Sequence, residues 1–358
     1  MKRRPRARAI HPARPSLHPR SPDRRAGTAY LYGHGESEPG SFRHTREEHP
    51  MSLSRRIPTL LAALALSVAT SASASAPSTP EVLSPGFISL PEQEEWRIAF
   101  TPDGRTAFWG VSAGFFPETR QATIVFSEWR HGRWTQPRPA PFSGVHSDID
   151  PFVSPDGRRL FFSSIRPVHG QPRADVEMWV VERRRDGGWG EPRHLGAAVH
   201  SASDELYPSV DAEGTLYFGS DREGGYGGWD IYRSRPRHDG TYGPAENLGP
   251  AINTEFWEFN PNVLADGKTL LFASIARPDG HGYGDLYVAR KTWRGWQPAR
   301  NLGPTVNTDL DEYHPTLSPD QRTLYFVRHQ YEPFVPGELY HVRVGGLLSE
   351  DGTCDVSH

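Results

Sequence analysis

Apolar and polar residues alternate along five stretches of the chain, and every stretch follows the same plan. One alternating run leads into a Pro-Asp-Gly, Ala-Asp-Gly or related turn, and a second alternating run follows. Alternation of this kind predicts strands with one face toward a core, and the turn residues suit a short hairpin. The five hairpins read EWRIAFTPDGRTAFWG, DIDPFVSPDGRRLFFSS, ELYPSVDAEGTLYFGS, EFNPNVLADGKTLLFAS and EYHPTLSPDQRTLYFVR.

The hairpins recur at a nearly constant period. Aligning them on the turn brings five positions into register, at spacings of 53, 57, 53 and 54 residues: Gly104, Gly157, Gly214, Gly267 and Gln321. Each hairpin is followed by a third alternating run: ATIVFS, VEMWVV, WDIYRS, GDLYVA or GELYHV. Four copies continue into a fourth segment, which starts at Trp134, Trp189, Tyr242 or Trp296. Four strands in each long repeat are typical of β-propeller blades.

The last copy stops near Val344 without a fourth segment. The stretch PEVLSPGFISL, residues 80–90, looks like PARNLGPTVNT, residues 298–308, which belongs to a fourth segment. An N-terminal strand that completes the last blade would close the ring and remove an open sheet edge. We therefore predict an all-β fold, a single β-propeller of five four-stranded blades closed by the N- and C-terminal strands.

Three stretches carry a family resemblance. SPDGRRLFF, GGYGGWDIY and ENLGPAINT resemble the WD-like (PD-type) propeller repeats of the TolB-related family, and the similarity runs from Pro80 to Val344. The resemblance implies a periplasmic or secreted propeller that binds proteins or cell-envelope components without catalysis. Propellers of this family more often have six blades, which makes six the alternative count, and this chain lacks the additional N-terminal domain of TolB itself.

The N-terminal part has a different character. Residues 1–50 are rich in Arg, Pro and His without hydrophobic periodicity, so we expect a disordered leader and infer that translation starts at Met51. In residues 51–76, an arginine pair precedes a short apolar run and then small residues, which indicates a secretory signal peptide. The apolar run is too short to span a membrane. We place the propeller at residues 77–344 and a C-terminal tail at residues 345–358.

Composition and charge narrow the function. The chain has 35 Gly, 34 Pro, 10 Trp, 13 Tyr and 17 Phe, a mixture that favours many short strands. The first 50 residues hold 11 of the 40 basic and 5 of the 43 acidic residues, so the remainder is acidic. An acidic chain argues against nucleic acid or an anionic membrane as the partner. The single cysteine, Cys354, excludes a disulfide within the chain.

A carboxylate recurs nine residues before every turn marker. The five are Glu95, Asp148, Glu205, Glu258 and Glu312. Blade symmetry would place them in one ring near one end of the central channel, where they would repel one another unless they had partners. Hard cations prefer several carboxylate oxygens, so one interpretation is a metal site, with calcium as the ion. The alternative is that each carboxylate accepts hydrogen bonds from its own neighbourhood.

The positions two residues further along are polar but dissimilar. They are Arg97, Asp150, Tyr207, Asn260 and His314. Positions that maintain a repeat's geometry tend to be alike from copy to copy, whereas a binding surface can break the symmetry. We predict that these five contact the ligand, and tolerated variation at the rim is the alternative.

Other motifs indicate structure more than chemistry. The loop SDREGGYGGWD, residues 220–230, lacks the Lys-Ser/Thr of a phosphate loop. GVSAG around Ser112 matches a nucleophile elbow, but the strand-to-helix context is missing. His146 and His200 take the place of asparagines in an Asn-Ser/Thr turn, so we interpret them as turn residues. We predict no catalytic residue.

Three functions compete. The first is an exported, non-catalytic propeller that binds a protein or envelope polymer at one end of the ring. The second is a glycoside hydrolase, which needs two or three inequivalent carboxylates in the channel. Its candidates are Asp148, Asp150, Glu205, Glu258 and Glu312. The third is a propeller that presents substrate to a partner enzyme.

Overall fold

A computed structural model describes residues 78–90 and 93–348, which lie in one compact unit. The predicted leader, the signal peptide and Cys354 lie outside the described residues. Within these ranges the chain is almost entirely β, which confirms the predicted all-β class. The exceptions are the one-turn helix α2 (Phe116–Thr119) and the 3-10 helix η1 (Gly345–Leu348).

The strands form five antiparallel groups, named repeats 1 to 5. Repeat 1 contains β2 (Glu94–Phe100), β3 (Thr106–Ser112), β4 (Thr123–Arg130), β5 (Arg133–Trp134) and β6 (Arg138–Pro139). Repeat 2 contains β7 (Asp148–Val153), β8 (Arg159–Ser164), β9 (Glu177–Glu182) and β10 (Arg193–His194). Repeat 3 contains β11 (Glu205–Val210), β12 (Leu216–Ser220), β13 (Asp230–Ser234) and β14 (Glu246–Asn247). Repeat 4 contains β15 (Trp257–Val263), β16 (Thr269–Ile275), β17 (Gly284–Thr292), β18 (Gly295–Trp296) and β19 (Arg300–Asn301). Repeat 5 contains β20 (Asp311–Leu317), β21 (Thr323–Gln330) and β22 (Val335–Arg343).

The N-terminal strand β1 (Glu81–Val82) pairs with the last long strand. Glu81 lies opposite His341 and Val82 lies opposite Tyr340, both in antiparallel register with β22. Repeat 5 thus has three strands from the C-terminal part of the chain and a fourth from the N-terminal part. A single parallel bridge between Gly284 and Asp311 joins repeats 4 and 5 into one larger sheet.

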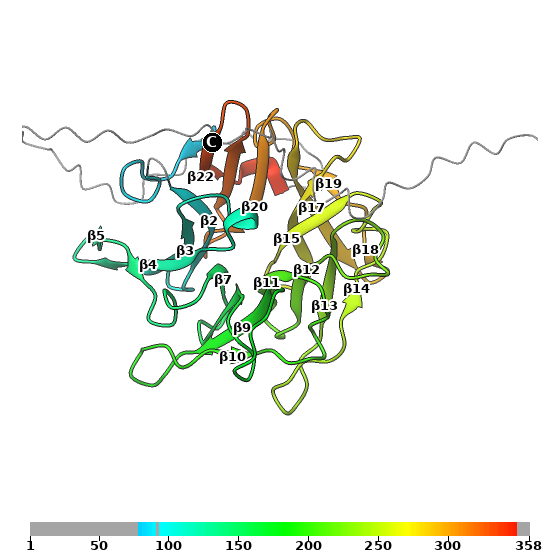
Figure 1. Cartoon of the computed structure of the whole chain (residues 1–358). Helices are drawn as coiled ribbons and strands as arrows, with labels where there is room; N and C mark the ends of the chain where they lie inside the picture. Colours follow the sequence, from blue (N-terminus) through cyan, green and yellow to red (C-terminus); the bar gives the residue numbers. More distant parts are fainter. Residues whose placement is uncertain (1–77, 91–92, 349–358) are drawn as a thin grey trace, which may run out of the picture. The chain divides into compact units, whose positions relative to one another are not determined.

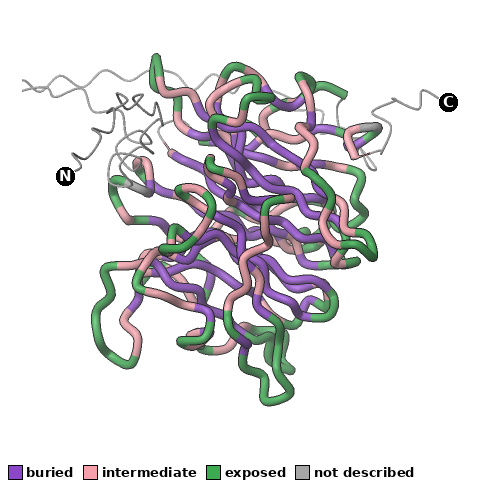
Figure 2. Tube along the Cα trace, turned by 90° about the vertical axis from the view of Figure 1, so that its right-hand side faces the viewer, coloured by how far each residue is buried: buried purple, intermediate pink, exposed green. Residues whose placement is uncertain are grey.

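The first strands of the five repeats lie around a common centre (Figure 1). Each first strand contacts the first strands of the two neighbouring repeats, and the last, β20, contacts the first, β2. In order, these strands are β2, β7, β11, β15 and β20. The inner strands are buried on both faces, which is why they appear as continuous purple tubes in Figure 2. Their apolar residues pack between neighbouring repeats, and their polar residues need partners inside the protein.

Each first strand contains a bulge at the position predicted to contact the ligand. The register with the second strand shifts there in all five repeats. Asp150, Tyr207, Asn260 and His314 have φ between 51° and 64°, and a proline follows each of them. Because proline has no N–H for the ladder, a bulge accommodates it without losing a strand bond.

The two ends of the strands differ. The Pro-Asp-Gly type turns join first to second strands at one end, here called the hairpin end. The loops between second and third strands lie at the other end, here called the α2 end because α2 is the loop of repeat 1.

Candidate functional site

The recurring carboxylates are fully buried, and four of them pair with an arginine, although their other partners differ from repeat to repeat. Glu258 accepts the Thr254 N–H, the hydroxyls of Thr254 and Ser274, and the guanidinium of Arg277. In repeats 2, 3 and 5 an arginine fills the same role at 2.5–2.8 Å: Arg166 on Asp148, Arg222 on Glu205 and Arg328 on Glu312. Each of these four carboxylates therefore has its charge balanced within its own repeat.

This geometry leads to a prediction for calcium. An arginine at hydrogen-bond distance from each of the four carboxylates competes with a metal ion for the same oxygens and repels it. We expect the midpoint of thermal unfolding to be the same with added calcium and with a chelator. A midpoint that rises with calcium and falls on chelation would support the metal interpretation of the ring.

Glu95 differs from the other four carboxylates. It is 0% exposed, it accepts the Leu90 N–H at 3.2 Å, and no arginine contacts it within the described residues. Burial raises the pKa of Glu95 to about 8, although the Leu90 N–H and the nearby Ser89 side chain both lower it. Repeat 1 thus breaks the pattern of the ring.

The five residues predicted to contact the ligand meet on the axis. Arg97 donates to the carbonyls of Pro208 and Pro261, both at 2.9 Å, so a side chain of repeat 1 reaches repeats 3 and 4. His314 Nδ1 lies 3.6 Å from Asp150 Oδ1. The His314 backbone N–H also donates to Asn260 Oδ1, and the rings of His314 and Tyr207 are 5.5 Å apart.

This axial cluster is closed to solvent except at Tyr207. Arg97, Asp150, Asn260 and His314 are 2% exposed or less. Burial raises the pKa of Asp150 to about 7, against the opposing charge of Arg97, and burial lowers the pKa of Arg97 to about 10. Burial, with the Arg97 charge, holds the pKa of His314 well below its usual range. The predicted ligand contacts are thus the residues that tie the repeats together, and only Tyr207 reaches the surface.

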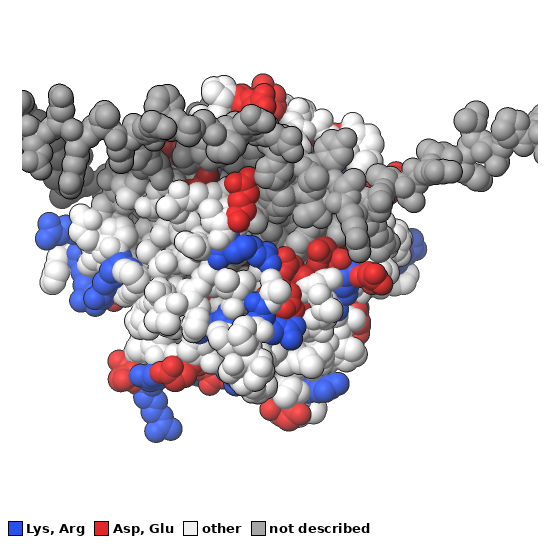
Figure 3. Space-filling view, in the orientation of Figure 1, with Lys and Arg blue, Asp and Glu red and all other residues white. Residues whose placement is uncertain are grey.

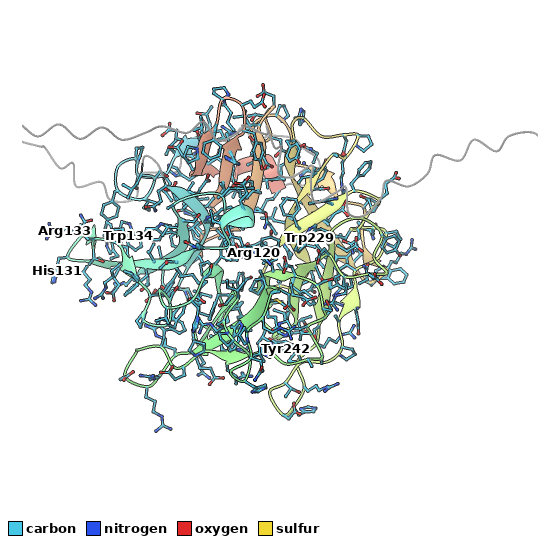
Figure 4. The ribbon with its side chains drawn as sticks, viewed as in Figure 1. Arg120, His131, Arg133, Trp134, Trp229 and Tyr242 are labelled. Atoms are coloured by element: carbon cyan, nitrogen blue, oxygen red, sulfur yellow. The ribbon has the colours of Figure 1, made fainter. Side chains whose placement is uncertain are left out.

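The segment that carries α2 covers the α2 end of the cluster. Phe115 and Phe116 pack on Trp96, with ring centroids 5.7 and 6.2 Å apart. Arg120, at the end of α2, pairs with Asp204 of repeat 3 at 2.9 Å. Figure 4 shows Arg120 near the centre of this end, and Figure 3 shows basic and acidic side chains around the middle of the same face. Repeat 1 therefore reaches repeat 3 across this end of the axial cluster, and we call this region the mouth.

Aromatic side chains gather around this mouth, and only Tyr207 among them was predicted from the sequence to contact a ligand. Six of them are partly exposed and come from four repeats, and we call them the mouth aromatics: Phe115, Tyr207, Trp229, Phe259, Tyr283 and Tyr331. Tyr207 lies 5.9 Å from Trp229 and 6.0 Å from Phe259, and Tyr331 lies 6.0 Å from Phe115 and 5.5 Å from Tyr283. In the sequence, several copies carry an aromatic residue between their second and third strands, which could have indicated this surface. Only the fold shows that these loops lie together.

One group has the residue types of a transition-metal site. The ligand atoms of Glu177, His194 and His200 lie within 4.8 Å of one another, and no other such group of three occurs in the described part of the chain. However, His200 Nε2 accepts the Met178 N–H at 2.8 Å, and His194 Nδ1 accepts the Gly196 N–H at 3.3 Å. Since each neutral ring then carries its proton on the other nitrogen, neither keeps a free lone pair for a metal.

The neighbouring repeat explains this histidine pair. In repeat 3 the equivalent residues are Asp230, Asn247 and Asn253, and Asn253 Oδ1 accepts the Ile231 N–H at 2.8 Å. His200 therefore performs the hydrogen bonding of an asparagine in the turn, in agreement with its interpretation as a turn residue. His146 does not, because it is exposed and Ser143 Oγ accepts the corresponding N–H.

The two remaining motifs serve structure. Ser112 Oγ accepts the Trp96 indole N–H and donates to the Gly114 carbonyl, so it is not paired with a base. In the glycine-rich loop, the carboxylate of Asp230 accepts the N–H groups of Tyr226 and Gly227. A Cβ at Gly225 would lie 2.0 Å from that carboxylate, which explains the glycine.

No protein family and no curated protein matches this chain. Among solved structures it is similar to TolB from Acinetobacter baumannii, with 15% identity and a TM-score of 0.42, over 69% of this chain and 54% of that one. It is similar to a GH43 endo-arabinanase from Bacillus licheniformis, with 12% identity and a TM-score of 0.46, over 72% of this chain and 96% of that one. It is also similar to an alpha-L-arabinofuranosidase from Lactobacillus brevis, with 13% identity and a TM-score of 0.48, over 76% of this chain and 96% of that one. This chain spans little more than half the length of that TolB, and likenesses at this level assign no activity or partner to it. In the described ranges, no helix is long and apolar enough to cross a membrane.

Proposed function

We propose that the chain is an exported, non-catalytic β-propeller that binds a protein or a cell-envelope component at the α2 end. In this proposal repeats 1 to 5 are five blades, and β1 supplies the missing strand of the last blade. The pairing of β1 with β22 supports the ring. The signal-peptide pattern of residues 51–76 supports a periplasmic or secreted location.

The mouth aromatics are the observation that carries the proposal. Partly exposed aromatic rings offer a large contact area and lose little conformational entropy on binding, which makes them common at the centres of interfaces. Tyr226 and Phe334, which are 51% and 57% exposed, extend the aromatic surface at the same end. Such a surface suits stacking on a peptide or on sugar rings of a polymer.

The glycoside hydrolase remains the alternative. It requires two or more carboxyl groups that touch the substrate, one of them protonated near neutral pH. The raised pKa values of Asp150 and Asp311, both about 7, favour it. Against it, both groups are buried, and the four arginine-paired carboxylates of the ring are 0% exposed.

A pull-down from envelope extract with the full chain tests the proposal. The variant changes Tyr226, Trp229 and Phe334 to alanine, which removes aromatic surface from two loops at the α2 end. We expect at least a tenfold loss of the captured partner, because these rings supply much of the apolar contact.

The matched control changes Trp129 and Trp293 to alanine. These residues are 44% and 88% exposed and lie at the hairpin end. Equal capture by the wild type, the variant and the control would reject the α2 end as the binding face. Hydrolysis of a polysaccharide that is lost in both Asp150→Asn and Asp311→Asn would instead establish the alternative.

A further inference from the structure

The carboxylate of repeat 1 lacks the arginine that all four of its counterparts have and the serine that three of them have. In repeats 2, 3 and 4 a serine lies opposite the carboxylate on the second strand and donates its hydroxyl to it: Ser164 to Asp148, Ser220 to Glu205 and Ser274 to Glu258, at 2.7–3.1 Å. The residue opposite Glu95 in the same register is Val111. Repeat 1 therefore replaces a hydroxyl donor by an apolar side chain.

The arginine is missing as well. In repeats 2 and 3 the arginine follows that serine by two residues, as Arg222 follows Ser220. The residue two positions after Val111 is Ala113. Arg166 and Arg222 stand at this position, just past the end of the second strand, and reach their carboxylates, so an arginine at the position of Ala113 would be placed to reach Glu95.

The other arginines show what such a guanidinium contacts. Arg222 also donates to the carbonyl of Val199, six residues before Glu205, and Arg277 and Arg328 make the same bond to carbonyls six residues before their own carboxylates. Six residues before Glu95 is Ser89, whose carbonyl accepts the Gly86 N–H and keeps a second lone pair. The second acceptor for a guanidinium is therefore present in repeat 1.

Glu95 is left with an unsatisfied oxygen. Its Oε2 atom makes no hydrogen bond to any described residue, and its side chain is fully buried. An unpaired buried polar atom costs free energy, which a donor or a cation reaching it would recover.

A pocket of about 630 Å³ lies against residues that flank this carboxylate, although Glu95 itself is not part of its lining. Its lining includes Leu90, whose N–H binds Glu95, together with Val111 and Ala113, the two residues that replace the serine and the arginine. Gln93 and Thr123 border it as well, and its described lining contains no Asp, Glu, Lys or Arg. The volume is within the range of ligand-binding pockets, roughly 300–1,000 Å³.

We propose that this pocket binds the guanidinium of an arginine side chain presented by a partner protein, in the space that an arginine of the chain itself fills in the other repeats. The guanidinium would donate to Glu95 and to the Ser89 carbonyl. The identity of the partner as a protein rests on the proposed function, whereas the preference of the pocket for guanidinium does not.

Titration calorimetry of the full chain with N-acetyl-arginine amide tests the pocket directly. The neutral comparison is N-acetyl-citrulline amide, which has nearly the same shape without the charge. We expect the arginine compound to bind at least tenfold more tightly. Equal affinities, or no binding of either compound, would overturn the proposal.

Three variants locate the binding. Glu95→Gln should lower the affinity for the arginine compound to that for the citrulline compound. Glu223→Gln, which changes an exposed carboxylate at the same end, should leave the affinity for the arginine compound unchanged. Ala113→Arg should supply the guanidinium internally, so it should abolish binding and raise the thermal midpoint. If Glu95→Gln fails to fold, Ala113→Arg decides alone, and arginine binding that persists in it would overturn the proposal. If the chain binds the arginine compound but captures no partner in the pull-down, only the proposed function is contradicted. If it captures a partner but does not bind the arginine compound, only this site is contradicted.

Discussion

Replacing Arg97 by methionine is expected to lower the free energy of unfolding by about 2–6 kcal/mol, because two buried carbonyls each lose a charged donor at roughly 1–3 kcal/mol apiece. Arg97 is 1% exposed, and its two donors to the Pro208 and Pro261 carbonyls join repeat 1 to repeats 3 and 4 across the axis. Without the guanidinium, both carbonyls lose a donor, and Asp150 loses the positive charge that opposes the rise of its pKa. Urea unfolding at neutral pH measures the effect.

Two further variants show whether the charge is responsible. Changing Asp150 to asparagine in the Arg97→Met background should recover part of the lost stability, because the second change removes the uncompensated carboxylate. Arg237→Met, at an exposed arginine of the hairpin end, should change stability by less than about 0.5 kcal/mol. An Arg97→Met protein that loses no more than Arg237→Met would show that the axial contacts do not support the fold.

Replacing Asp311 by asparagine is expected to remove a pH dependence of stability between about pH 5 and pH 7. Burial raises the pKa of Asp311 to about 7, with the charges of Glu312 and Asp285 adding to it and the Tyr331 hydroxyl opposing it. The folded chain then holds a proton that the unfolded chain, with its ordinary value of 3.8, has already released. The contribution of Asp311 to the free energy of unfolding is therefore fully present at low pH. It falls as the pH rises through this window, by up to about 1.4 kcal/mol per pH unit.

Urea unfolding of the wild type and the variant across this window measures the difference, because the buried histidines contribute equally to both. Asp239→Asn is the control. Asp239 is exposed, and its hydrogen bonds from Thr241 lower its pKa, so its contribution changes only below pH 4 or so. If the wild type and Asp311→Asn had parallel curves from pH 5 to pH 7, Asp311 would already be ionised in the folded chain, contrary to the prediction.

Local pattern accounts for much of the fold. The alternation on each side of a turn such as that at Gly157 specifies a hairpin through contacts between residues close in the chain. The likeness of residues 80–90 to residues 298–308 indicated where the N-terminal segment belongs, and β1 does pair with β22. The fourth segments were harder to delimit, because β10 and β14 are only two residues long.

The candidate site was less accessible to sequence reasoning. Repeat symmetry grouped Arg97 with Asp150 and His314, but their burial depends on contacts between repeats, which a local pattern does not show. The arginine partners of the carboxylates were visible in principle, because Arg166 and Arg222 occupy matching positions in two copies and Ala113 occupies the same position in a third.

The sequence by itself determined the all-β class, the five repeated hairpins and the positions of the recurring carboxylates, because these follow from periodicity and from turn chemistry within one repeat. Only the tertiary structure decided which carboxylates are neutralised, which polar residues are buried on the axis and which aromatic side chains share a surface. Those properties depend on contacts between residues of different repeats, as Arg97 with Pro261 shows, and no pattern within one repeat contains them.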